Sequence, residues 1–539
     1  MINLILLLSA VVLIACVIGS KISTRLGVPT LLFFIALGMI FGSDGLFKIH
    51  FENYSIAEQI CSSALIFIMF YGGFGTKWST ARPVALKATL LSTLGVLITA
   101  TLTGYFCHVI LGIDLLESML IGAVLSSTDA ASVFSILRSQ RLNLKYNTAP
   151  LLEIESGSND PCAYMMTIIL LTAMGANISV GTIGYDIFAQ LAYGLLIGVS
   201  LAYIGGWLLR NVQFGEDGFD SILLVAIALA SYALPSLIGG NGYLSTYIAG
   251  IILGNQTIPK KKNLVNFFDA FNGMMQMVIF FLLGLLVYPS KLPMYFIPAL
   301  CIAVFLTVVA RPIATAVLLT SFKAPLNQQL IISWAGLRGA ASIVFAIVAV
   351  VSPNYGNDSI FSIVFCVVLL SLLFQGALLP FASKKLNMID DNENVLKTFN
   401  DYSEENDIQF IRLEIKNNHP WIDRQIREFG AIPGALIAAI IRKGVTITPK
   451  GNTFLREGDC LIICAKSYQD KDGITLNEIQ IDEKNPFIDK KLRDIDLHKD
   501  SLVVLIQRDG EDIIPDGETM IKKGDTIVVY SQKDLVKIA

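Results

Sequence analysis

A chain of 539 residues would ordinarily fold into about three or four soluble domains. Here 54% of the residues are hydrophobic, only 15% are charged and the mean hydropathy is +0.63, which excludes a soluble multidomain protein. Residues 1–385 carry 19 Lys and Arg against 15 Asp and Glu, whereas residues 386–539 carry 21 against 28. An acidic tail argues against nucleic-acid binding, which favours basic surfaces.

Apolar runs of about 20 residues, long enough to span a bilayer, recur along the first 385 residues. Thirteen such runs are centred near residues 12, 35, 65, 98, 126, 163, 197, 227, 248, 277, 306, 339 and 370. If the N-terminus lies outside, fifteen Lys and Arg fall in inner loops and two in outer loops, as the positive-inside rule requires. The odd number of spans then places the acidic tail in the cytoplasm.

The fifth and twelfth runs, IGAVLSSTDAASVFSIL and IISWAGLRGAASIVFAI, are interrupted by small and polar residues. They occupy matching places in a six plus one plus six arrangement, and both interruptions end in Ala-Ala-Ser. This pattern predicts inverted six-helix repeats with two broken helices, a feature of secondary transporters. The alternative is that the small residues only allow close helix packing.

Carboxylates gather in the middle of the predicted membrane domain. The sixth run begins LLEIESGSNDPCAYMM and brings Glu153, Glu155 and Asp160 within eight residues, and the fifth run adds Asp129. Each ionised carboxylate in hydrocarbon costs at least about 2.5 to 3.5 kcal/mol, so these groups need partners or a function. In a helix, Ser156 and Asp160 share one face and Glu155 and Asn159 share another.

The first face offers a carboxylate and a hydroxyl, hard oxygen ligands that suit an alkali cation. Burial favours the protonated carboxyl and a bound cation favours the ionised form, so Asp160 can hold a proton or a metal cation in turn. On the second face Glu155 is predicted to pair with Arg338 of the twelfth run, with Asn159 holding the pair in register. The alternative is that these charges only stabilise packing.

The run Glu155 to Pro161 (ESGSNDP), with Ser126 to Asp129 (SSTD) before it and Gly336 to Gly339 (GLRG) after it, carries a family resemblance. Residues 1–385 resemble the monovalent cation/proton antiporters of the first cation-proton-antiporter family. The Gly-Ser pair followed by Pro161 is most similar to the branch called cell volume regulation protein A, potassium/proton antiporters with cytoplasmic regulatory lobes.

The resemblance implies a transporter, not an enzyme, that exchanges cytoplasmic K⁺ for H⁺ one for one at Asp160 by alternating access. It implies Ser156 and the backbone of Thr128 as further cation ligands, and Asn159, Asp129, Glu155 and Arg338 as the supporting network. It also implies a homodimer in a bacterial cytoplasmic membrane. Many relatives have an acidic residue where this chain has Tyr71, before Gly72 and Gly73. The phenol carries no charge near neutral pH, so Na⁺ in place of K⁺ stays an alternative.

The predicted membrane domain is residues 1–388, followed by a polar linker at 389–404. Two lobes, 405–468 and 472–539, form a repeat: a shift of 66 positions superposes Pro420 on Pro486, Arg442 on Arg508 and Gly458-Asp459 on Gly524-Asp525. Each lobe is predicted to contain a helix and then two strands, an α+β unit. The lobes resemble the C-terminal ligand-sensing lobes of regulator-of-potassium-conductance domains. That resemblance implies a small cytoplasmic ligand, such as cyclic di-AMP, or a role in dimerisation alone.

The tail contains no G-x-G-x-x-G after a strand, so no NAD or other cofactor is expected. A ligand-gated potassium channel is the remote alternative, since Thr182-Ile183-Gly184-Tyr185 resembles part of a potassium filter. Asp186 follows in place of the glycine that a filter needs. The four His are scattered and show no catalytic spacing.

Overall fold

The structure is a computed structural model of the whole chain, which divides into two compact units, residues 1–403 and 404–539. Each unit is described by itself. The described residues are 2–26, 30–140, 142–175, 179–212, 218–259, 261–390, 408–415, 421–429, 435–442, 445–466, 475–481, 485–495, 501–508, 511–513 and 515–531. Most of the predicted linker, residues 391–404, lies outside them.

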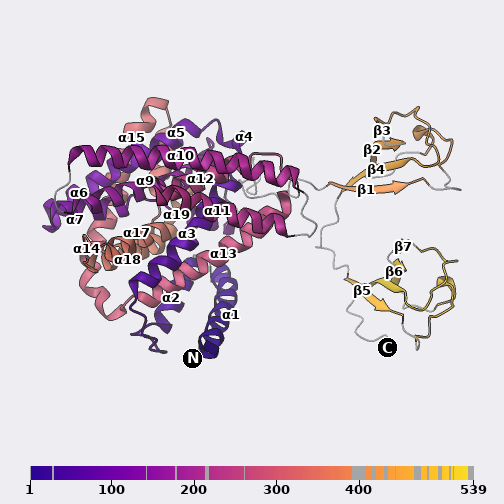
Figure 1. The fold of residues 1–539 in the computed structure, drawn as a ribbon, viewed down its shortest axis with the longest axis horizontal. Coiled ribbons are helices and arrows are strands. Elements are labelled where there is room, and N and C mark those ends of the chain that lie inside the picture. Colours follow the sequence, from indigo (N-terminus) through magenta and orange to yellow (C-terminus); the bar gives the residue numbers. More distant parts are fainter. Residues whose placement is uncertain are drawn as a thin grey trace. The chain divides into compact units, whose positions relative to one another are not determined.

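Unit 1 is a bundle of helices (Figure 1), and every predicted membrane run is helical at its centre or contains a break between two helices there. The elements are α1 (Ile2–Leu26), α2 (Thr30–Phe41), α3 (Tyr54–Gly75), α4 (Trp78–Ala81), α5 (Ala85–Leu90), η1 (Leu91–Gly95), α6 (Val96–Leu111), α7 (Leu115–Val124), α8 (Ala130–Ser139), α9 (Thr148–Ala173), α10 (Val180–Asn211), α11 (Phe219–Leu237), α12 (Gly242–Gly254), α13 (Lys261–Leu286), η2 (Pro289–Lys291), α14 (Leu292–Phe305), η3 (Leu306–Ala310), α15 (Arg311–Leu319), η4 (Thr320–Phe322), α16 (Leu326–Trp334), α17 (Ala340–Val351), α18 (Ser359–Leu370), η5 (Ser371–Gly376) and α19 (Ala377–Lys385).

Seven of the described helices are long and apolar enough to cross a membrane, and five shorter apolar helices accompany them. The predicted class, a helical polytopic membrane domain followed by α+β lobes, is confirmed. The predicted breaks are also present: five residues separate α7 from α8, and five separate α16 from α17. Small and polar residues favour interruption because they contribute little lipid-facing surface and can satisfy freed backbone groups with their own side chains.

Three described π-helical segments interrupt longer helices, a feature that the apolar pattern alone did not reveal. The segments η1 and η3 belong to the fourth and eleventh membrane runs, which correspond under the predicted repeat. The third, η5, lies in the last run. π segments of this kind often mark functional sites in helices.

Glycine allows helices α3 and α12 to approach each other closely. A Cβ atom on Gly73 of α3 would lie 2.4 Å from the carbonyl oxygen of Tyr247 in α12, and one on Gly250 would lie 2.4 Å from the carbonyl oxygen of Phe70. Close backbone contact at small residues is a main source of helix association in lipid. α3 and α12 therefore form a tight pair.

Unit 2 contains two four-stranded antiparallel sheets of the same order, β1-β4-β2-β3 and β5-β8-β6-β7. The strands are β1 (Ile408–Glu414), β2 (Ala435–Arg442), β3 (Val445–Ile447), β4 (Cys460–Lys466), β5 (Thr475–Gln480), β6 (Ser501–Arg508), β7 (Glu511–Ile513) and β8 (Thr526–Ser531). A register shift falls between Ile437 and Ala439 in β2 and between Val503 and Leu505 in β6, positions that are 66 residues apart. The predicted repeat thus extends to the fine geometry of the strands.

The internal composition of each lobe differs from the sequence prediction. Two strands per lobe were expected and four are present: the first strand of each lobe was not identified, and the hairpin strands are only three residues long. The predicted helix is represented in the described residues only by short 3₁₀ turns, Ile426–Phe429 and Leu492–Asp494. In both lobes a buried Asp forms an ion pair with the Arg that ends a central strand. Arg442 of β2 pairs with Asp459 and Arg508 of β6 pairs with Asp525, each at 2.7 Å.

Candidate functional site

The two helix breaks meet in the interior of unit 1. The backbone N–H of Asp129, at the end of the first break, donates to the carbonyl oxygen of Leu337 in the second break at 2.8 Å. Arg338 reaches back and donates through Nη1 to the carbonyl oxygens of Ser126 and Ser127, at 2.9 and 2.8 Å. These carbonyls follow the C-terminus of α7, where a cation is stabilised by the helix dipole. Arg338 therefore satisfies backbone groups that the first break leaves free.

Asp160 lies in the middle of α9, with only 5% of its surface exposed. Its Oδ1 accepts a hydrogen bond from the hydroxyl of Ser127, which belongs to the first break. The next residue, Pro161, removes one N–H donor from α9. Asn241 at the start of α12 donates through Nδ2 to the Pro161 carbonyl at 2.9 Å and so ties α12 to this part of α9.

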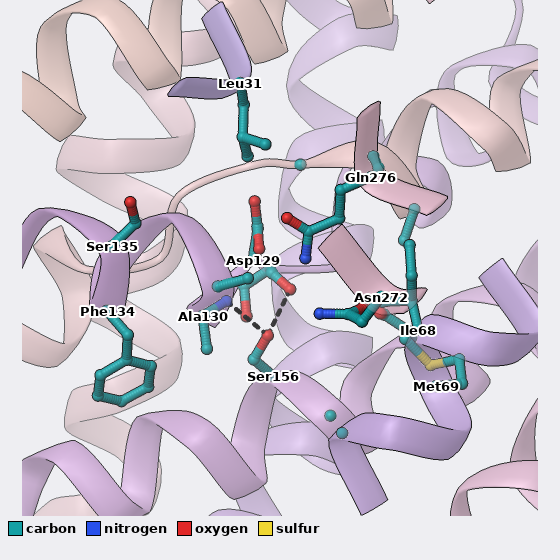
Figure 2. A pocket seen from close by; sticks show the side chains of 18 of the residues that line it. Leu31, Ile68, Met69, Asp129, Ala130, Phe134, Ser135, Ser156, Asn272 and Gln276 are labelled. Atoms are coloured by element: carbon teal, nitrogen blue, oxygen red, sulfur yellow. Dashed lines mark hydrogen bonds between the residues drawn. The ribbon is translucent and has the colours of Figure 1, made fainter. Parts of the chain in front are cut away.

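Ser156, Thr128 and Asn159 form a second set of contacts between α9 and the first break. Ser156 donates through Oγ to the carbonyl oxygen of Thr128 at 2.7 Å and accepts from the N–H of Ala130 at 2.8 Å (Figure 2). Asn159 donates through Nδ2 to Thr128 Oγ1 at 2.5 Å. The structure thus brings the Thr128 carbonyl, the Ser156 hydroxyl and Asp160 to one place, as the predicted ligand set requires.

Asp129 stands at the N-terminal end of α8 and accepts hydrogen bonds from the hydroxyl and the backbone N–H of Ser132, the latter at 3.3 Å. This is the geometry of an N-cap, which satisfies donors that the first turn leaves free. A Cβ atom on Gly339 would lie 2.4 Å from the Cβ of Asp129. Only glycine therefore lets the second break pass beside Asp129.

The predicted ion pair between Glu155 and Arg338 is wrong. Glu155 pairs with Arg311, the first residue of α15, and these side chains are 1% and 2% exposed. Arg338 is 3% exposed but has the Ser126 and Ser127 carbonyls as its partners. A buried carboxylate binds whichever guanidinium the packing brings to it, and α15 brings Arg311.

Arg311 was visible in the sequence as a basic residue inside an apolar run, the signal that could have identified it. Its side chain passes beside the second break, where a Cβ atom on Gly336 would lie 2.7 Å from Arg311 Nε. This contact explains the first glycine of the GLRG run. Ser127 and Asn241 are the other contributors that residue-by-residue reasoning did not assign to the site.

A cavity of about 610 Å³ lies against this constellation. It is lined by the carboxylates of Asp129, Glu153, Asp160 and Asp269, and no Lys, Arg or His is among its described lining residues. Thr128, Ser156 and Tyr71 also line it. A cavity lined by one sign of charge concentrates the opposite ion. The arrangement is suited to binding a cation.

Comparison with known proteins also separates the membrane domain from the two C-terminal lobes. Residues 11–385 match the family model described as sodium/hydrogen exchanger, transmembrane. Residues 410–469 and 476–537 each match the model of the TrkA-C domain.

Curated relatives match most of the chain. One is named K(+)/H(+) antiporter NhaP, from Alkalimonas amylolytica, and is 34% identical over 86% of this chain and 82% of its own. Another, K(+)/H(+) antiporter NhaP2 of Shewanella sp. (strain MR-4), is 33% identical over 86% of this chain and 81% of its own.

Among solved structures, the sodium proton antiporter MjNhaP1 from Methanocaldococcus jannaschii is similar with a TM-score of 0.62 and 25% identity. The match covers 71% of this chain and 99% of that one. The membrane helices, the site at the two helix breaks and the matched family model all indicate the same family. The chain belongs to the sodium/hydrogen exchanger family, a family of cation/proton antiporters, and carries TrkA-C domains at its C-terminal end.

Proposed function

We propose that this antiporter exchanges K⁺ for H⁺ without net charge transfer, with both ions competing for Asp160. The observation that carries the proposal is the burial of this one carboxylate beside a helix break, at a cavity that it shares with Ser156 and Thr128. The relatives from Alkalimonas and Shewanella are both named for K⁺/H⁺ antiport.

Protonation and cation binding place different demands on the same atoms. With a proton, Asp160 is neutral and its burial costs little. With a cation, the ionised carboxylate, the Ser156 hydroxyl and the Thr128 carbonyl supply oxygen ligands, and the hydrogen bond from Ser156 to Thr128 must turn away. The bare ionised site is the unfavourable form to move through the protein, since it is a buried charge without a partner. One ion therefore crosses for each ion returned.

The remaining polar groups of the site support this binding set. Asn159 holds the Thr128 hydroxyl, and Asp129 caps α8 where the break ends. The Glu155–Arg311 pair anchors α9 to α15, and Arg338 keeps the freed carbonyls of the first break in place. Asn159 at the position before Asp160 adds no second titratable group, in keeping with one proton per cycle.

The topology and partners follow the sequence reasoning. The N-terminus lies outside a bacterial cytoplasmic membrane and the lobes lie in the cytoplasm, with domain limits at residues 1–388, 389–404, 405–468 and 472–539. The protein forms a homodimer, and the lobes bind a small cytoplasmic ligand, a nucleotide such as cyclic di-AMP, that regulates exchange. The TrkA-C match supports a regulatory role for both lobes.

Sodium/proton antiport is the second candidate. A relative named Na(+)/H(+) antiporter NhaS2, from Synechocystis, is 28% identical over 61% of this chain. The structural relative from Methanocaldococcus is also named for sodium.

The two candidates are separated by reconstituting the full chain into acid-loaded liposomes and following the dequenching of a pH-sensitive dye after addition of K⁺, Na⁺, Rb⁺ or Li⁺. Potassium/proton exchange predicts dequenching with K⁺ at lower concentrations than with Na⁺, unchanged when valinomycin clamps the membrane potential. A response to Na⁺ with none to K⁺ supports the second candidate. No response to any cation contradicts both.

A further inference from the structure

The cavity beside Asp160 has a polar wall on α13 that does not belong to the proposed cation ligands, Asp160, Ser156 and Thr128. Asp269, Asn272 and Gln276 all line the cavity, and their spacing places them on one face of the helix. In Figure 2 the amide ends of Asn272 and Gln276 point into the space in front of Asp129 and Ser156. This wall faces the binding set across the cavity.

Asp269 differs from the other carboxylates of the cavity because its side chain is exposed, whereas Asp160 is buried. A charged group within a membrane-spanning helix is tolerated where water reaches it. The cavity therefore connects an exposed carboxylate to a buried one. Asp269 lies about 12 Å along α13 from Lys261, at 1.5 Å per residue, in the half of the helix that begins at the basic residues assigned to the cytoplasm by the proposed topology.

Tyr71 makes the connection between this entrance and the third span. Its hydroxyl donates to Asp269 Oδ1 at 2.8 Å, while its side chain is 3% exposed. The phenol holds the carboxylate from the protein side and leaves the other side to the cavity. One turn along α13, the Oδ1 of Asn272 is buried and has no hydrogen-bond partner among the described residues. The Asn272 side chain therefore has a hydrogen-bonding group to spare at the wall of the cavity.

We propose that Asp269, held by Tyr71, captures the cation at the cytoplasmic entrance and biases the exchanger towards K⁺ over Na⁺. This inference rests on the proposed function and deepens it. A carboxylate that already accepts a hydrogen bond from a phenol presents a weaker field to a cation. Weak-field oxygen ligands favour the larger ion, because K⁺ loses its water at a lower cost than Na⁺ does.

The two residues make separable contributions. The charge of Asp269 raises the local concentration of either cation, an effect that salt screens. The phenol of Tyr71 adjusts the strength of that carboxylate as a ligand and so acts on the difference between K⁺ and Na⁺. Asp269 is thus an entrance residue and Tyr71 a positioning residue.

The test measures dequenching by the full-length protein in liposomes as a function of K⁺ and of Na⁺ concentration. We expect Asp269→Asn to raise the KM for both cations by about fivefold, equal to about 1 kcal/mol, with a smaller change in maximal rate. Added choline chloride should raise the KM of the native protein but not that of Asp269→Asn. Asp269→Glu, which keeps the charge, should retain a KM near that of the native protein.

Tyr71→Phe removes the donor and keeps the ring. We expect it to lower the ratio of the Na⁺ KM to the K⁺ KM by about threefold. Asp186→Asn and Tyr185→Phe on α10, which do not line the cavity, are the matched controls and should change neither quantity. An unchanged KM in Asp269→Asn overturns the capture role, and an unchanged ratio in Tyr71→Phe overturns the selectivity role. A native protein that responds to no cation contradicts the proposed function itself, an outcome distinct from either.

Discussion

Glu155 of α9 and Arg311 of α15 form an ion pair whose members are 1% and 2% exposed. The pair joins the helix that carries Asp160 to a helix 156 positions later in the chain. Breaking such a pair by removing one partner leaves a buried charge and typically costs about 3–5 kcal/mol, whereas replacing both partners with apolar side chains is often neutral.

We therefore expect Glu155→Leu and Arg311→Met each to lower the melting temperature and the yield of monodisperse protein in detergent. The double variant should recover most of both losses. Fluorescence-detected size exclusion after a temperature ramp measures this directly. Glu155→Leu combined with Arg338→Met serves as the control and should show no such recovery. Recovery in that combination instead would mean that Arg338 is the partner after all.

Asp160→Asn removes the group that both ions are proposed to share. The amide has nearly the same shape, and the Ser127 hydroxyl that now donates to Oδ1 can still do so. We expect cation-dependent proton movement in liposomes to fall to the level of empty vesicles, with unchanged elution in size exclusion. Asp220→Asn, at the start of α11 and outside the cavity, should exchange normally. Residual exchange by Asp160→Asn would refute the shared-site mechanism.

Truncation tests the regulatory role of the tail, and the structure indicates where to cut. Residues 388–390 belong to the membrane unit: the N–H of Lys145 donates to the Met388 carbonyl at 2.8 Å, and the N–H of Asp390 donates to the Asn143 carbonyl at 3.0 Å. A chain that ends after Asp390 should retain exchange but lose part of its dependence on pH or on added nucleotide. A chain that ends after Lys385 loses these contacts and should be less stable in detergent.

The repeated Arg–Asp pairs predict the acid stability of the lobes. The hydrogen bond from Arg508 lowers the pKa of Asp525 below its ordinary value of 3.8. A carboxyl whose pKa is lower in the folded state stabilises that state above its unfolded pKa, and the contribution is lost as the pH falls through the folded value. Asp525→Asn should therefore speed hydrogen exchange at β6 and β8 near neutral pH, and this difference should shrink as the pH falls below the ordinary carboxyl pKa of 3.8.

The first lobe is the internal control for that experiment, because Arg442 and Asp459 make the same contacts 66 positions earlier. Its amides at β2 and β4 should exchange as in the native protein. Equal acceleration in both lobes would show that they unfold as one unit and that the pair in each lobe does not act locally.

The membrane architecture was predictable because lipid imposes a length and a composition on every span. The interruptions at 125–129 and 335–339 were predictable for the same reason, since Ser126 to Asp129 and Gly336 to Gly339 fit poorly in a lipid-facing helix. The π segments were not predictable, because they change the hydrogen-bond register without changing the apolar pattern.

The site was predicted in part. The contacts among Ser156, Thr128 and Asn159 agree with the expected neighbourhood, since helical spacing placed Ser156 and Asp160 on one face and motif order brought the fifth run beside it. The partner of Glu155 was not predictable from spacing, because two arginines lie inside spans and only the tilt and depth of α15 decide which one reaches the carboxylate. In the lobes, the central strands were visible as continuous apolar runs, whereas the edge strands β1 and β5 are interrupted by polar residues.

The single backbone hydrogen bond from Asp129 to Leu337 has a mechanical consequence. It joins the break between α7 and α8 to the break between α16 and α17. Neither break can move alone without stretching this hydrogen bond and the two hydrogen bonds that Arg338 makes beside it. A substitution that displaces either break should therefore also disturb the other, and with it the Thr128 carbonyl of the proposed cation site.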